Sequence, residues 1–156
     1  MQELWVALAA SDVATALRMS RWSYAAVNTA HVAGIALLFG SVVALDLRLL
    51  GLWRAIAIAD LARPLVRIAA AGLTVAVASG ALLFATRADE YAALGIFWIK
   101  LTLIAIGTAS AIGHHLRYGW ALTGASPRAL HMAGATSLLC WAGALLCGRL
   151  IAFMGE

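Results

Sequence analysis

Charged residues are scarce in this sequence. Asp, Glu, Lys and Arg make up 12% of its 156 residues, whereas a soluble domain carries roughly 25%. Hydrophobic residues make up 64%, and the mean hydropathy is +0.94. These values exclude an ordinary soluble domain and indicate a membrane protein whose length suits a single compact bundle.

Cysteine is also rare. Cys140 and Cys147 are the two cysteines, seven residues apart on one expected helix. About 10 Å of helix rise separates them, which is too far for a disulfide between them. They therefore say nothing about the redox compartment. The first residues lack a basic segment, so we expect no cleavable signal peptide.

Motifs typical of soluble enzymes and nucleic-acid-binding proteins are absent. The sequence has no glycine-rich phosphate loop, no CxxC or CxxCH pair, no HExxH motif and no meaningful Ser-His-Asp spacing. The net charge is +4, but no run of Lys and Arg is dense enough to bind nucleic acid. In a membrane protein such an excess is typical of cytoplasmic loops.

Four apolar runs are long enough to cross a bilayer, since about 20 residues at about 1.5 Å each cover about 30 Å. We therefore expect an all-α fold, a four-transmembrane-helix bundle. An amphipathic helix anchored by Trp5 should precede it in the interface, and a short surface helix should end before Pro64. The predicted ranges are 3–18 for the interfacial helix, 23–45, 65–84, 95–115 and 129–153 for the membrane helices, and 85–94 and 116–129 for polar connections.

The arginines predict an orientation. Six lie at one end of the expected bundle and four at the other, which favours the first end as cytoplasmic and both termini as periplasmic, in a bacterial inner membrane. The first six are Arg48, Arg54, Arg63, Arg67, Arg117 and Arg128, and the other four are Arg18, Arg21, Arg87 and Arg149.

Small residues at four-residue spacing, such as Gly72, Ala76 and Gly80, would let helices approach closely in lipid. We expect such rows to pack the bundle or to make room for a flat cofactor such as haem. The expected partners are the lipid bilayer and either further copies of the chain or a larger membrane complex.

An outer layer of polar residues follows from counting inward from the outer face. His31, Lys100 and Cys147 fall at similar depths, together with Ser79 and Gly80. Polar side chains in hydrocarbon are costly and mark candidate functional sites. Lys100 either extends back to the interface or faces inward to an anion, such as a haem propionate, a quinone oxygen or a carboxylate.

Three roles are open for His31. It could bind haem iron as a single axial ligand, pair with Cys147 as a second ligand, or hydrogen-bond to Asn28 on the same helix face. By helix rise it lies about 15 Å or more from His114 and His131. It therefore cannot share one haem with either of them.

An inner layer holds His114, His115, His131 and Asp46. His131 with His114 or His115 could hold a b-type haem between facing helices. The three histidines could instead bind zinc or copper, with Asp46 as a fourth ligand. They could also simply satisfy carbonyls at helix ends.

Asp46, Arg48 and Gly51 lie where the first apolar run ends. Asp46 and Arg48 are two residues apart and so do not share a helix face. We expect them to mark the cytoplasmic boundary and to hold the 46–64 segment in place.

Several residues between about 22 and 105 form a recognisable pattern. They are Trp22-Ser23-Tyr24, Asn28, His31, Gly34, Leu45 to Leu52, Ser79-Gly80, Phe84, Phe97 and Lys100-Leu101. With this pattern the chain resembles a family of small bacterial inner-membrane proteins of unknown function. That family is predicted to have four helices and is loosely similar to the copper-resistance D membrane domain and to small b-type cytochrome subunits. The resemblance implies that His31, Asp46, Arg48, Gly51 and Lys100 belong to a shared pattern.

Three functions follow as hypotheses. The first is a haem b protein that transfers electrons or anchors a redox complex, with ligands from His31, His114, His115 or His131. The second is a non-catalytic membrane subunit or scaffold. The third is a copper- or other metal-binding membrane protein. The sequence does not decide whether the chain is an enzyme.

Overall fold

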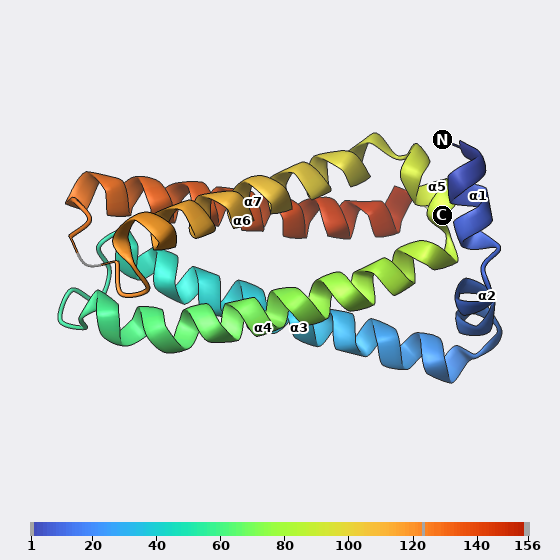
Figure 1. Cartoon of the computed structure of the whole chain (residues 1–156), viewed down its shortest axis with the longest axis horizontal. Coiled ribbons are helices and arrows are strands. Elements are labelled where there is room, and N and C mark those ends of the chain that lie inside the picture. Colours follow the sequence, from blue (N-terminus) through green and yellow to red (C-terminus); the bar gives the residue numbers. More distant parts are fainter. Residues whose placement is uncertain (1, 123, 155–156) are drawn as a thin grey trace.

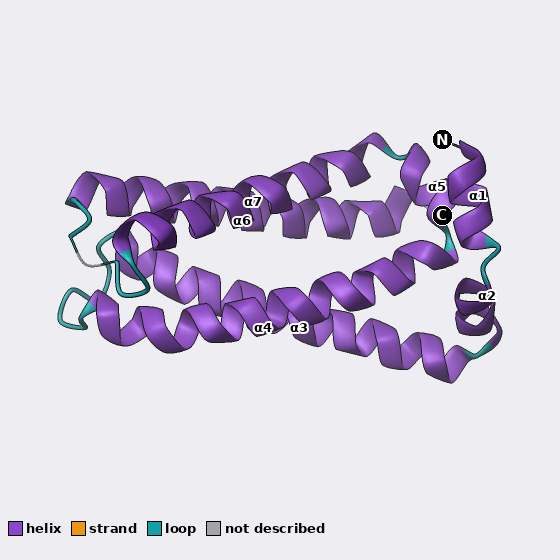
Figure 2. Cartoon of the chain, in the orientation of Figure 1, coloured by secondary structure: helices purple, strands orange, loops and turns teal. Residues whose placement is uncertain are grey.

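The computed structural model describes residues 2–122 and 124–154, which form helices and no strand. The predicted all-α fold is confirmed. Figure 2 shows the helices joined by short loops. The helices are α1 (Gln2–Ala9), α2 (Asp12–Met19), α3 (Arg21–Leu49), α4 (Ile58–Thr86), α5 (Ala88–Ala93), α6 (Gly95–Tyr118) and α7 (Pro127–Met154). Among them, α3, α4, α6 and α7 are long and apolar enough to cross a membrane.

The long helices form two antiparallel pairs, α3 with α4 and α6 with α7 (Figure 1). Both ends of the chain lie at the end of the bundle that carries α1, α2 and α5 (Figure 1). Helix α3 also packs against α7, whereas the backbones of α4 and α6 do not approach within 8 Å of each other in the described residues. The helices therefore follow the order α4, α3, α7, α6 around the bundle. Helices α4 and α6 meet through side chains near the chain termini, where Phe84 stacks on Phe97.

The first two long helices extend further than predicted. Helix α3 continues past Asp46 to Leu49, because the Asp46 side chain turns into the protein and does not end the helix. The short surface helix predicted before Pro64 is wrong, since α4 already starts at Ile58 and contains Pro64. Because Pro64 has no N–H group, the carbonyl of Asp60, four residues earlier, loses its helical hydrogen bond. Pro64 lies near the start of α4 and Asp60 is exposed, so the helix tolerates this single loss.

The N-terminal segment is two helices, not the single predicted helix 3–18. The Ser11 hydroxyl accepts a hydrogen bond from the Ala14 amide at 3.4 Å and so caps α2. The predicted polar turn 85–94 also contains a helix, α5, which has Asp89 and Glu90 in its first turn. Acidic residues favour that position because they complement the helix dipole.

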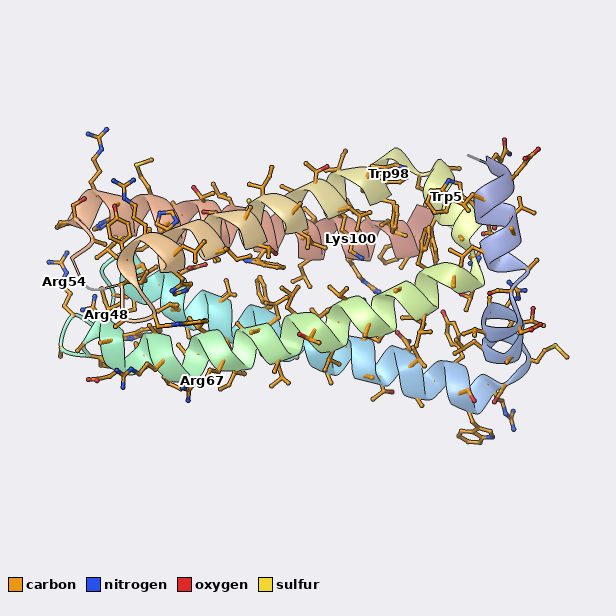
Figure 3. All side chains as sticks on the ribbon, in the orientation of Figure 1. Trp5, Arg48, Arg54, Arg67, Trp98 and Lys100 are labelled. Atoms are coloured by element: carbon orange, nitrogen blue, oxygen red, sulfur yellow. The ribbon has the colours of Figure 1, made fainter. Side chains whose placement is uncertain are left out.

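Aromatic rings close the end of the bundle that carries the termini. Trp5 packs edge-on against Phe84 at 5.6 Å between ring centroids, and Phe84 stacks on Phe97 at 5.0 Å. Figure 3 shows Trp5 and Trp98 at this end. Burial raises the pKa of the Tyr91 hydroxyl, which therefore stays neutral within this cluster.

Glycines bring α3 and α4 into backbone contact. A Cβ placed on Gly34 would lie 2.7 Å from the Ala76 amide nitrogen, and one on Gly72 would lie 2.6 Å from the Leu38 nitrogen. Gly72 and Ala76 thus pack the bundle, as their spacing predicts. Gly40 differs, because a Cβ there would meet nothing within 4 Å. Gly34 and Gly72, unlike Gly40, are therefore required by packing.

We predict that Gly34→Ala lowers the free energy of unfolding by about 1–3 kcal/mol, since the added methyl group would overlap backbone atoms that cannot move aside. Gly40→Ala is the matched control on the same helix and should leave stability unchanged or slightly raised. Reversible denaturation in mixed micelles measures both. Equal effects of the two substitutions would contradict the crossing.

Candidate functional site

A cavity of about 400 Å³ lies among all four long helices, in the half of the bundle away from the chain termini. This volume is within the range of small-molecule sites. Most of the wall is apolar, with side chains such as Leu38, Leu73 and Ile112. The polar residues of the wall are Ser41, Asp46, Thr108, Ser110, His114, His115 and Ser137.

One side of the cavity is loosely packed. Helices α4 and α6 both line it but, in the described part of the chain, their backbones do not come within 8 Å of each other. A hydrophobic cluster packs at the cavity's end away from the chain termini, and all of its buried members except Ala62 also line the cavity. The cluster contains Leu45, Leu49, Ala62, Leu122 and Ala133. The loosely packed side between α4 and α6 faces outward, where a membrane-spanning bundle meets lipid.

Asp46 is the most buried polar residue of the wall, with 3% of its surface exposed. Its Oδ2 atom has no hydrogen-bond partner among the described residues. Helix α7 passes very close here, because a Cβ on Gly134 would lie 3.0 Å from the Asp46 carbonyl oxygen. Ser137, one turn further along α7, faces the carboxyl group. One carboxyl oxygen is therefore left for a ligand.

His114 contributes a second polar group to the same cavity. Its Nδ1 lies 2.8 Å from the Ser110 carbonyl oxygen. A carbonyl can only accept, so Nδ1 carries the proton and Nε2 is the nitrogen left with a lone pair. Thr108 on the same helix has a buried hydroxyl oxygen without a partner among the described residues. The wall thus has two buried oxygen atoms without a partner among the described residues, on Asp46 and Thr108, and a half-buried His114 whose Nε2 can accept.

The other two inner histidines behave differently. The His115 ring stacks on Trp120 at 5.6 Å and, like His114, comes from α6. His131 is exposed, its Nδ1 lies 2.6 Å from the Pro127 carbonyl oxygen, and it is not part of the cavity wall. Helices α3, α4 and α7 bring no histidine to this wall. A haem in this cavity would therefore have axial histidine ligands from one side only.

A metal cluster is not assembled in the described residues. No three His, Cys, Asp or Glu side chains there come close enough together to hold a metal ion. The zinc or copper site predicted from His114, His115, His131 and Asp46 is therefore not formed in the described residues.

The outer polar layer is brought together as depth counting predicts. The His31 Nδ1 lies 2.9 Å from the Ala76 carbonyl and 3.2 Å from the Ser79 hydroxyl, and its ring packs against Gly80. Asn28 is exposed and is not its partner. His31 therefore binds to the backbone of α4.

Lys100 faces inward and not toward the interface. Its side chain points into the space between the two helix pairs (Figure 3) and packs near Gly148, where a Cβ would lie 3.8 Å from Nζ. Its charge is close enough to act on His31. Lys100 therefore lies in the outer layer with His31, and neither residue lines the cavity.

Arg48 holds the connection between α3 and α4. Its Nε donates to the Ile56 carbonyl at 2.6 Å, and its Nη2 lies 3.5 Å from the Arg54 carbonyl. Gly51 takes a φ of +101°, a conformation that favours glycine. Arg48, Arg54 and Arg67 all lie toward this end of the bundle (Figure 3). Arg48 thus holds its segment, whereas Asp46 turns away into the cavity.

Sequence reasoning missed several wall residues, among them Ser41, Thr108 and Ser137. Small hydroxyl residues also occur at lipid-facing positions, where Thr74 and Thr102 bond to carbonyls of their own helices. Nothing in the local sequence separates the two groups. Only the arrangement of the helices does so.

No protein-family model, no curated protein and no solved structure matches this chain. The resemblance to small inner-membrane proteins therefore remains a prediction.

The unpaired carboxyl oxygen gives a prediction about stability. Asp46→Leu should raise the free energy of unfolding by about 1–3 kcal/mol, because it removes a buried polar group without a partner. Asp60→Leu, on the exposed start of α4, should change it by less than about 0.5 kcal/mol. Denaturation in detergent measures both. A strong loss of stability in Asp46→Leu would instead make Asp46 a structural residue.

Proposed function

We propose that this chain is a membrane protein that binds a lipid-soluble electron carrier of the quinone type in the cavity. The single observation that carries the proposal is the buried, unpaired carboxyl oxygen of Asp46 in the wall of an otherwise apolar cavity. Leaving such a group unpaired is costly. A ligand with a polar head and an apolar tail would satisfy both parts of the wall.

The loosely packed side between α4 and α6 supports the same class of ligand. A quinone has a flat polar ring and a long hydrocarbon tail. Its ring would lie against Asp46 and His114, while the tail would leave between the two helices into lipid. The aromatic face of Trp141, which is 7% exposed and lines the cavity, suits a flat ring.

In this proposal the cavity lies in the cytoplasmic half of an inner membrane, which the positive-inside rule supports because Arg48, Arg54 and Arg67 lie at its end of the bundle. In this proposal the chain serves electron transfer, either by itself or as the quinone-binding anchor of a redox complex.

A b-type haem in the same cavity is the second candidate. The hydrogen bond from Nδ1 of His114 to the Ser110 carbonyl favours it, because this arrangement orients a histidine whose Nε2 binds iron. The wall supplies no histidine from the facing helices, so this haem would depend on α6 alone for histidine ligands.

A pair of variants on α6 tests the quinone proposal. We expect purified wild-type protein to carry about one isoprenoid quinone per chain, measured by mass spectrometry after solvent extraction. Ala111→Phe should reduce this severalfold, because Ala111 lines the cavity and the larger ring would fill it. Ala109→Phe is the matched control, since Ala109 is exposed and outside the wall. Equal quinone contents in Ala111→Phe and wild type would contradict the proposal.

An absorption spectrum separates the two candidates. If the cavity binds quinone, protein expressed with ample haem should show no Soret band. A Soret band that is lost in His114→Ala and kept in His131→Ala would assign the cavity to haem. Protein without either ligand would favour the scaffold hypothesis instead.

A further inference from the structure

The free polar atoms of Asp46 and His114 are hydrogen-bond acceptors. The Nε2 of neutral His114 can only accept, because Nδ1 holds the ring proton. An ionised Asp46 can also only accept, and its Oδ2 is the atom without a partner among the described residues. The hydroxyls of the wall, on Thr108 and on Ser41, Ser110 and Ser137, can donate or accept. At Asp46 and His114 the ligand therefore has to bring donors.

The two redox forms of a quinone differ in this property. The oxidised form has two carbonyl oxygens, which only accept, whereas the reduced hydroquinone has two hydroxyl groups, which donate as well as accept. A protonated Asp46 could donate to a carbonyl, but Nε2 of His114 would still lack a donor. A hydroquinone hydroxyl can hydrogen-bond to Asp46 whether this residue is ionised or protonated, and a hydroxyl can also donate to Nε2 of His114.

We infer that the cavity selects the reduced, hydroquinone form of its ligand through Asp46 and His114. This selectivity rests on the proposed function, since it concerns the same cavity. A site whose buried acceptors are left unpaired by one ligand discriminates strongly against that ligand. We expect the hydroquinone to bind at least about tenfold more tightly than the quinone. For a two-electron couple, a tenfold preference raises the midpoint potential of the bound pair by about 30 mV.

Equilibrium dialysis under anaerobic conditions tests the selectivity. The probes are a decyl-substituted benzoquinone and its hydroquinone, which differ by two electrons and two protons, so that two carbonyl groups become two hydroxyl groups. Binding is measured to protein in micelles, and the uptake of Ala111→Phe is subtracted as partitioning into detergent. Wild type should bind the hydroquinone at least about tenfold more tightly.

Two substitutions assign the preference to its residues. Asp46→Asn keeps the shape of the side chain but adds a donor, so it should strengthen quinone binding, weaken hydroquinone binding and abolish the preference. His114→Phe should reduce the preference severalfold, since the ring stays and the acceptor is lost. Asp60→Asn makes the same chemical change as Asp46→Asn at an exposed position and should leave the preference unchanged.

The outcomes separate this inference from the proposed function. If wild type binds both forms equally and more than Ala111→Phe does, the selectivity is wrong and the quinone site stands. If neither form binds more to wild type than to Ala111→Phe, the proposed function itself fails. A preference that survives Asp46→Asn overturns the role of Asp46. If dioctanoylglycerol binds more tightly than the hydroquinone, the hydrogen-bond donor that the cavity recognises is a lipid hydroxyl group. This result would overturn the inference that the ligand is a hydroquinone.

Discussion

Close backbone contact at glycines joins α3 to both of its neighbours. Gly34 and Gly72 let the backbones of α3 and α4 cross, and Gly134 lets α7 approach the α3 carbonyl at Asp46. In lipid, where no hydrophobic force holds helices together, such close packing is a main source of attraction. Helix α3 is therefore the element on which the other long helices are arranged.

This arrangement leaves α4 and α6 apart. Because α4 packs on one side of α3 and α7 packs on another, the backbones of α4 and α6 stay apart where both line the cavity. The polar groups of the wall come from three helices, with Asp46 on α3, His114 on α6 and Ser137 on α7. The same contacts that stabilise the bundle thus bring those groups to one cavity.

Much of the fold follows from the sequence, because four long apolar runs have few alternatives in a membrane. Depth is also readable, since a constant rise per residue places His31 level with Ser79 and Gly80. The end of α3 cannot be predicted from the sequence, because an acidic residue after an apolar run normally marks the end of a membrane helix, whereas Asp46 is buried. The sequence also does not show which helices pack against each other. Gly34 and Gly40 have similar surroundings in the sequence, yet only Gly34 faces another backbone.

The loosely packed side between α4 and α6 determines which phase supplies a ligand to the cavity. Aromatic rings cover one end of the bundle, and a hydrophobic cluster packs toward the other. A molecule that enters between the two helices comes from the hydrocarbon phase. Its occupancy then depends on its mole fraction among the lipids, and the rate of exchange depends on bilayer viscosity more than on diffusion through water.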